Sequence, residues 1–149
     1  IHDWHSVIAD VQRTLVEGGL LAVGESIRKG ISAEVNSQYK VIRDKRGYGY
    51  RRVGAQDIDE VLGYLRSIRC SVPQQPENQS WVGHMSINSI IQGLADKIYS
   101  GTWNVPDEAH LGLIQELREW ANERYNNLEV SREVSAEFKL AFIRFPTTG

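Results

Sequence analysis

Residues 37–53, SQYKVIRDKRGYGYRRV, decide whether the chain is all-helical or a mixture of helices and strands. Two β-prone runs, 37–43 and 48–53, flank the tetrapeptide Asp44-Lys45-Arg46-Gly47, which has the composition of a turn. Glycine often supplies the positive φ that a tight turn needs. The stretch therefore predicts a β-hairpin at about residues 37–53.

Outside this stretch, apolar residues recur mostly at helical spacing. They predict amphipathic helices over 3–17, 57–69, 86–101 and 106–128. Ser86 is expected to cap the third helix, and Pro106 with two following acidic residues suits the first turn of the fourth. Residues 20–28 fit either a short helix or a strand.

The stretch 133–145 alternates polar and apolar residues, although Val134, Phe138 and Phe142 also lie at helical spacing. Its aromatic character and the following Pro146 favour a half-buried strand. The expected fold is therefore α+β, with four or five amphipathic helices, a β-hairpin at about 37–53 and a C-terminal strand.

The chain has 149 residues, of which 41% are apolar and 24% charged, and this composition suits a single domain over 1–149. Residues 70–85 contain two prolines and little periodicity, so they are expected to form a long loop and a candidate hinge. Trp81 lies in that loop and Trp103 in another. Loop tryptophans are typical of binding hot spots.

Opposite charges are segregated along the chain, although the formal net charge is only −2. Residues 40–52 hold six basic side chains and one acidic one, whereas residues 107–137 hold eight acidic and three basic ones. The basic stretch therefore has an acidic counterpart, either in the same chain or in a second copy.

The composition also bears on location. The lone Cys70 cannot form an intramolecular disulfide, which favours the cytoplasm or another reducing compartment. The sequence has no apolar run of about 18 residues, so we expect no membrane partner. The first residue is Ile1 rather than Met, which indicates a processed amino terminus or an excerpt from a longer chain.

The predicted hairpin would bring tyrosines and arginines to one face, because alternate residues of a strand point the same way. Rings that stack on bases and guanidinium groups that neutralise phosphates suit single-stranded nucleic acid. A solvated hairpin, with its tyrosines packed on a helix and its arginines paired with Glu and Asp, is the alternative. The nucleic-acid-binding candidates are Lys40, Arg43, Lys45, Arg46, Tyr48, Tyr50, Arg51 and Arg52.

Residues 46–50, RGYGY, resemble the opening of the ribonucleoprotein octamer in RNA-recognition motifs, and residues 45–50 resemble the aromatic strand of cold-shock domains. This resemblance implies nucleic-acid binding. The chain departs from the octamer at Arg51, where an apolar residue is usual, and at Val53, where an aromatic residue is usual.

No pattern singles out a catalytic or metal site. His2, Asp3 and His5 are close in sequence, but a metal site needs three or four converging ligands. Cys70 and His84 share a predicted loop, as a nucleophile and its base would, but a buried or incidental cysteine is commoner. We therefore expect no catalytic residue, no metal and no cofactor, and a non-enzymatic function over an enzymatic one.

The leading hypothesis is an interaction or assembly module that works as a homo-oligomer or as a subunit of a larger complex. Segregated charges, loop tryptophans and an apolar C-terminal strand that needs a partner support it. The order helix, hairpin, helix over 3–69 is similar to that of small phage head-to-tail joining proteins, which implies a complex of virion type. A nucleic-acid-binding domain is the alternative. The interface candidates are Trp81, Trp103, Phe138, Phe142, Glu116, Glu119 and Glu123.

Overall fold

The computed structural model describes residues 3–49, 54–73 and 78–146, and the chain divides into two compact units. Unit 1 comprises Ile1–Ile27, Arg51–Ser80 and Glu137–Gly149. Unit 2 comprises Arg28–Tyr50 and Trp81–Ala136. Each unit has its own buried cluster. That residues 1–149 act as one domain stays a prediction.

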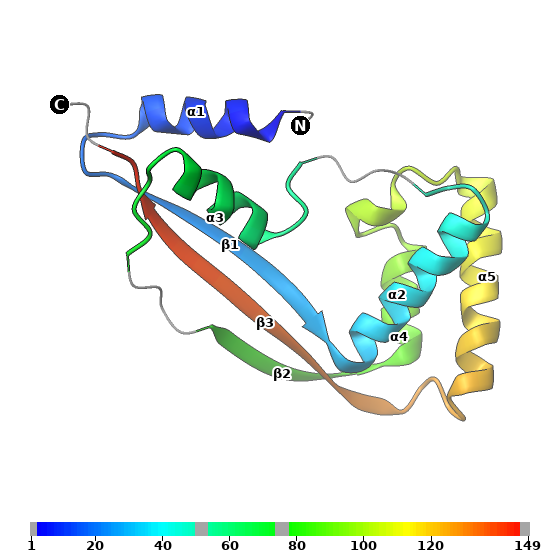
Figure 1. Ribbon diagram of the computed structural model, residues 1–149. Coiled ribbons are helices and arrows are strands. Elements are labelled where there is room, and N and C mark those ends of the chain that lie inside the picture. The colour runs from blue at the N-terminus through cyan, green and yellow to red at the C-terminus, as the bar shows by residue number, and fades with distance from the viewer. Residues whose placement is uncertain (1–2, 50–53, 74–77, 147–149) are drawn as a thin grey trace. The chain divides into compact units, whose positions relative to one another are not determined.

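One antiparallel sheet contains β1 (Leu20–Lys29), β2 (Gln79–Ser86) and β3 (Ser131–Arg144), in the order β1-β3-β2 (Figure 1). The α+β class and the C-terminal strand are confirmed, and residues 20–28 are a strand. Because β3 is central, its backbone groups find partners on both sides within the same chain. The C-terminal strand therefore has a partner strand on each side within its own chain.

Unit 1 contains α1 (Trp4–Thr14) and α3 (Ile58–Ser67), both of which were expected from their apolar stripes. Asp57 caps α3 by accepting a hydrogen bond from the Glu60 amide at 2.8 Å. The stripe of α1 is only half-buried. The core of unit 1 consists of Ile58, Leu62, Leu65, Cys70, Ala141 and Ile143.

Unit 2 contains α2 (Gly30–Lys45), α4 (Ile87–Ala95) and α5 (Asp107–Arg124), which pack against one another in all three pairs. Ser86 caps α4 as expected, because its hydroxyl accepts a hydrogen bond from the Ser89 amide at 3.0 Å. A short 3-10 turn, η1 (Ser100–Thr102), lies between α4 and α5. The core consists of Val35, Tyr39, Ile42, Ile87, Ile90, Ile91, Leu94, Val105, Leu113, Ile114, Leu117 and Ala121.

The predicted β-hairpin at 37–53 is wrong, because residues up to Lys45 belong to α2 and residues 50–53 lie outside the described part of the chain. Val35, Tyr39 and Ile42 are buried in one core, as their spacing of four and three allows on a helix. The expected turn is the end of this helix. Gly47 has a φ of +82°, and its amide donates to the Asp44 carbonyl at 3.0 Å.

The predicted loop at 70–85 is wrong in its second half, since Gln79–Ser86 is β2 and Trp81 lies in a strand. The hinge stays a prediction, and residues 74–77 lie outside the described residues.

The helix expected to reach Gly101 ends at Ala95, because Lys97 adopts a φ of +53° and its amide bonds to the Leu94 carbonyl at 3.1 Å. A lysine in this conformation is uncommon, so the sequence does not mark this helix end. As a result, Ile98 leaves the buried stripe.

Candidate functional site

The basic residues at the end of α2 are largely engaged within unit 2. Arg43 is buried, and its guanidinium donates to the Asp44 carboxylate at 2.7 Å and to the Gly101 carbonyl at 3.1 Å. Arg46 donates to Glu116 on α5 through Nε at 2.8 Å and Nη2 at 2.6 Å. The basic and acidic stretches therefore meet inside one chain at this pair.

Two tyrosines of the predicted nucleic-acid face are also occupied. Tyr39 lies in the core, and Tyr48 packs against it. Lys40 and Lys45 are exposed on α2. Tyr50, Arg51 and Arg52 lie outside the described residues. Helical geometry distributes these side chains around α2, so the described residues do not form the expected row of tyrosine and arginine.

The interface candidates fall into separate places. Phe138 and Phe142 are half-buried on β3 in unit 1. Glu119 and Glu123 are exposed on α5, whereas Glu116 is paired with Arg46. Trp81 and Trp103 are both exposed and both belong to unit 2, one in β2 and the other after η1.

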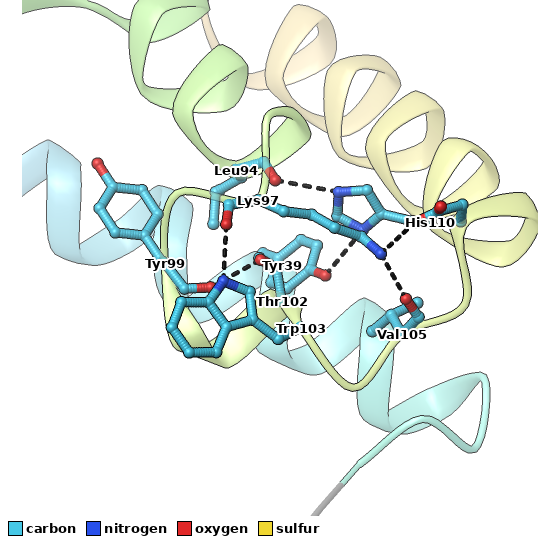
Figure 2. Close-up of polar contacts among 9 residues, drawn as sticks. Tyr39, Leu94, Lys97, Tyr99, Thr102, Trp103, Val105 and His110 are labelled. Carbon is cyan, nitrogen blue, oxygen red and sulfur yellow. Dashed lines mark hydrogen bonds and ion pairs between the residues drawn. The ribbon is translucent and has the colours of Figure 1, made fainter.

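Trp103 lies in a segment that we call the Trp103 loop, residues 96–106. Its indole Nε1–H donates to the Lys97 carbonyl at 2.8 Å (Figure 2). The ammonium group of Lys97 reaches across the loop, where it donates to the Val105 carbonyl at 2.7 Å and pairs with Asp107. The hydrogen bond from Lys97 lowers the pKa of the Asp107 carboxyl. The two ends of the loop are thus tied to each other.

Beneath the loop, His110 connects three helices of unit 2. It is 3% exposed, and its Nε2 lies 3.0 Å from the Leu94 carbonyl while its Nδ1 lies 3.2 Å from the Tyr39 hydroxyl (Figure 2). Because a carbonyl only accepts, Nε2 carries the proton and Nδ1 accepts from tyrosine. Thr102 adds a hydrogen bond to the Tyr99 carbonyl at 2.7 Å. This network fixes the backbone that presents Trp103.

The loop exposes large apolar side chains in spite of this ordered base. Ile98 is 62% exposed and Trp103 66% exposed. Tyr99, between them in sequence, packs against the core, and the Arg28 guanidinium lies 4.6 Å from the centre of its ring. The loop therefore combines a hydrogen-bonded frame with uncovered apolar surface.

Strand β2 is a second exposed apolar element of unit 2. Among the described residues it pairs with β3 on one side only, so it is a sheet edge. Trp81 is 49% exposed, Val82 61% and Met85 40%, and His84 is exposed too. The strand has no charged residue. Its exposed apolar residues lie on both faces, since neighbours in a strand point to opposite sides.

The described residues contain no cluster of three or more His, Cys, Asp or Glu side chains that could hold a metal ion. His5 stacks on Trp4 with ring centres 3.9 Å apart, and His2 lies outside the described residues. Cys70 is buried in unit 1, and this burial raises the pKa of its thiol. A raised pKa disfavours the thiolate that a nucleophile needs. His84, its candidate partner, belongs to unit 2.

In the part of the chain that the structure describes, no helix is both long enough and apolar enough to cross a bilayer.

Sequence reasoning missed Ile98 and the edge position of β2. The alternation of Trp81, Gly83 and Met85 with polar residues at 80, 84 and 86 was the available signal for a strand. Ile98 fits the stripe of the preceding helix, and only the unusual backbone at Lys97 turns it outward.

Comparison of the sequence with models of protein families finds no match, and comparison with curated proteins finds none either.

Proposed function

We propose that the protein is a non-enzymatic interaction and assembly module, working as a homo-oligomer or as a subunit of a larger protein complex. The observation that carries this proposal is the Trp103 loop. A tryptophan that is 66% exposed has its indole N–H already bonded to the Lys97 carbonyl within its own loop.

Rigidity is what makes this loop suitable for binding. Tryptophan is the residue type most enriched among binding hot spots. A side chain that is already ordered loses less conformational entropy when a partner covers it. The hydrogen bond from Lys97 to the Val105 carbonyl holds the loop in the unbound protein. The hydrogen bond between buried His110 and the Leu94 carbonyl supports it from below. Ile98 adds a second apolar anchor.

Nucleic-acid binding has weaker support. Arg43 and Arg46 already contact Asp44 and Glu116. Lys40, Lys45 and Arg46 are the exposed cations among the described candidates, and Arg46 is already paired with Glu116. A polyanion would have to compete with internal partners for the two arginines.

Sedimentation velocity of the native protein at micromolar concentration, with Trp103→Ala beside it, tests the proposal. We expect association with itself or with a co-purifying protein, and a loss of about tenfold or more in affinity in the variant. Leu111→Ala, an exposed apolar residue on α5, is the matched control and should leave association unchanged. A strict monomer without a co-purifying partner contradicts the proposal.

A titration with labelled single-stranded DNA and RNA at two salt concentrations separates the alternative. One result would replace the assembly proposal by a nucleic-acid-binding one. In that result, the protein binds the labelled strands tightly, Lys40→Ala and Lys45→Ala weaken this binding, and Trp103→Ala does not change protein association. We expect no such binding.

A further inference from the structure

The two edges of the sheet differ in how they are protected. β1 carries Glu25, Arg28 and Lys29. The Glu25 carboxylate accepts a hydrogen bond from the Ile58 amide at 3.0 Å. Proteins commonly guard a sheet edge with charges and with covering contacts of this kind. β1 therefore has the features of a sheet edge that does not pair with another chain.

β2 lacks the charged side chains that β1 carries. Its eight residues, QSWVGHMS, contain no charge and no proline. Half of its backbone N–H and C=O groups point away from β3, because the groups of a strand alternate between its two sides. A row of such groups beside exposed Trp81, Val82 and Met85 is a template for another extended strand.

We propose that β2 pairs antiparallel with β2 of a second copy, so that the two sheets of three strands join into one across a two-fold axis. This inference rests on the proposed function and adds a second contact surface to it, since the β2 pairing uses no residue of the Trp103 loop. The absence of charge supports the second copy as occupant, since two identical strands then meet without like-charge repulsion. A two-fold contact also closes on itself and leaves no further β2 edge to extend.

The geometry of antiparallel pairing restricts the register. Residues directly opposite each other point their backbone groups either both inward or both outward. In two identical strands, odd-numbered residues therefore oppose odd-numbered ones, and even-numbered residues oppose even-numbered ones. Trp81 can face Met85, but it cannot face Val82.

Two allowed registers pair the most residues, one centred on Val82 and the other on Gly83. The structure favours Gly83 at the axis, because each exposed Trp81 then lies opposite the exposed Met85 of the other copy. An indole against a thioether is a favourable contact that covers both side chains. Val82 then lies opposite His84 on the other face.

Charge variants at Val82 test the pairing in the full chain. Its side chain is 61% exposed, so Val82→Lys and Val82→Glu should leave the fold intact by circular dichroism. In the dimer, the two substituted positions lie near the axis. We expect each variant to be monomeric at a concentration where the native protein is dimeric, and an equimolar mixture of the two to restore the dimer. Val41→Lys, at a 57% exposed position of α2, is the matched control and should remain dimeric.

Disulfide trapping tests the register. A Cβ at Gly83 would meet only the Val134 Cγ2 at 3.8 Å, so Gly83→Cys fits the folded chain. Directly opposite residues in an antiparallel pair have Cα atoms about 4.5–5.5 Å apart, within disulfide range. We expect Gly83→Cys to crosslink faster than Val82→Cys, and both faster than exposed Leu111→Cys. Faster trapping through Val82→Cys would overturn this register.

The outcomes separate this inference from the proposed function. A dimer that Val82→Lys does not weaken, or a mixture of charge variants that stays monomeric, overturns the β2 pairing. Association that depends on Trp103 but not on Val82 also overturns it and leaves the proposed function standing. A strictly monomeric protein without any partner contradicts both the β2 pairing and the proposed function.

Discussion

Gly24 of β1 illustrates a constraint at the scale of single residues. A Cβ at this position would lie 2.5 Å from Cζ of Phe138 on the neighbouring strand. The ring of Phe138 therefore lies directly over the glycine and uses the space that a side chain would need. Phe138, a candidate interface residue from sequence, has a packing role inside unit 1.

Adding a methyl group at Gly24 should destabilise unit 1. We expect Gly24→Ala to lower the free energy of unfolding by about 1–3 kcal/mol, because the Phe138 ring must move to an unfavourable position. Urea denaturation followed by circular dichroism measures this loss. In the Phe138→Leu background the same substitution should be less harmful. An equal loss in both backgrounds would mean that the ring is not the obstacle.

Removing the Tyr39 hydroxyl should lower the free energy of unfolding, because buried His110 needs a hydrogen-bond donor at Nδ1. In Tyr39→Phe the Nδ1 atom of His110 loses its partner in the core, and an unsatisfied buried acceptor costs about 1–3 kcal/mol. Urea denaturation measures the loss. Nitrogen chemical shifts of the histidine ring should report the Nε2–H tautomer in the native protein. The Nδ1–H tautomer would contradict the assigned network.

At the scale of elements, helix α2 shows what sequence patterns can and cannot predict. Helices α3, α4 and α5 follow from their apolar stripes, and the side chains of Asp57 and Ser86 cap the first two of them. For α2, the β-prone Tyr39 and Val41 and the glycine at 47 suggested strands and a turn. Burial of Tyr39 together with Val35 and Ile42 overrides that local preference. The glycine has the expected positive φ, but at a helix end.

The candidate site was less predictable than the fold for a related reason. Trp103 could be selected by residue type and loop position alone. Ile98 could not, because its exposure depends on the left-handed backbone of Lys97, which non-glycine residues seldom adopt. The pairing of Arg46 with Glu116 depends on how α2 and α5 pack, which neither charge cluster specifies by itself.

The contact between α2 and α5 should make stability depend on pH in the acid range. Hydrogen bonds from Tyr125 and Arg124 lower the pKa of Glu34 on α2. A lowered folded-state pKa contributes stability that is present above the ordinary carboxyl value of about 4.3 and is lost as the pH falls through the lowered value. We expect Glu34→Gln to reduce the acid dependence of urea midpoints measured below pH 5. The effect should be small, since the carboxylate is 38% exposed. An unchanged pH profile would contradict this role.

At the scale of the whole molecule, the chain has two buried clusters that share no residue among the described ones. Unit 1 relies on Leu65 and unit 2 on Ile91, both fully buried. Truncation of either should cost about 2–5 kcal/mol, because it leaves a cavity in a close-packed core.

Because the two units have separate cores, we expect a core substitution to reduce amide protection from hydrogen exchange only in its own unit. In Leu65→Ala, amide hydrogen exchange should accelerate in α3 while α4 and α5 keep their protection, and Ile91→Ala should show the reverse. Mass spectrometry of peptides from both variants measures this. Equal acceleration throughout the chain in both variants would show that the two units unfold as one.

The central position of β3 has a consequence for how the protein is made. About 100 residues separate Lys29, where β1 ends, from Ser131, where β3 begins. At a translation rate of about 5–20 residues per second, β1 waits roughly 5–20 s for the strand that pairs with it. β2 waits for the same strand, whereas α2 and α4 are complete earlier. During synthesis, the nascent chain therefore carries β1 unpaired, and later β2 as well, at least until translation passes Arg144, and this interval is when it most needs protection from aggregation.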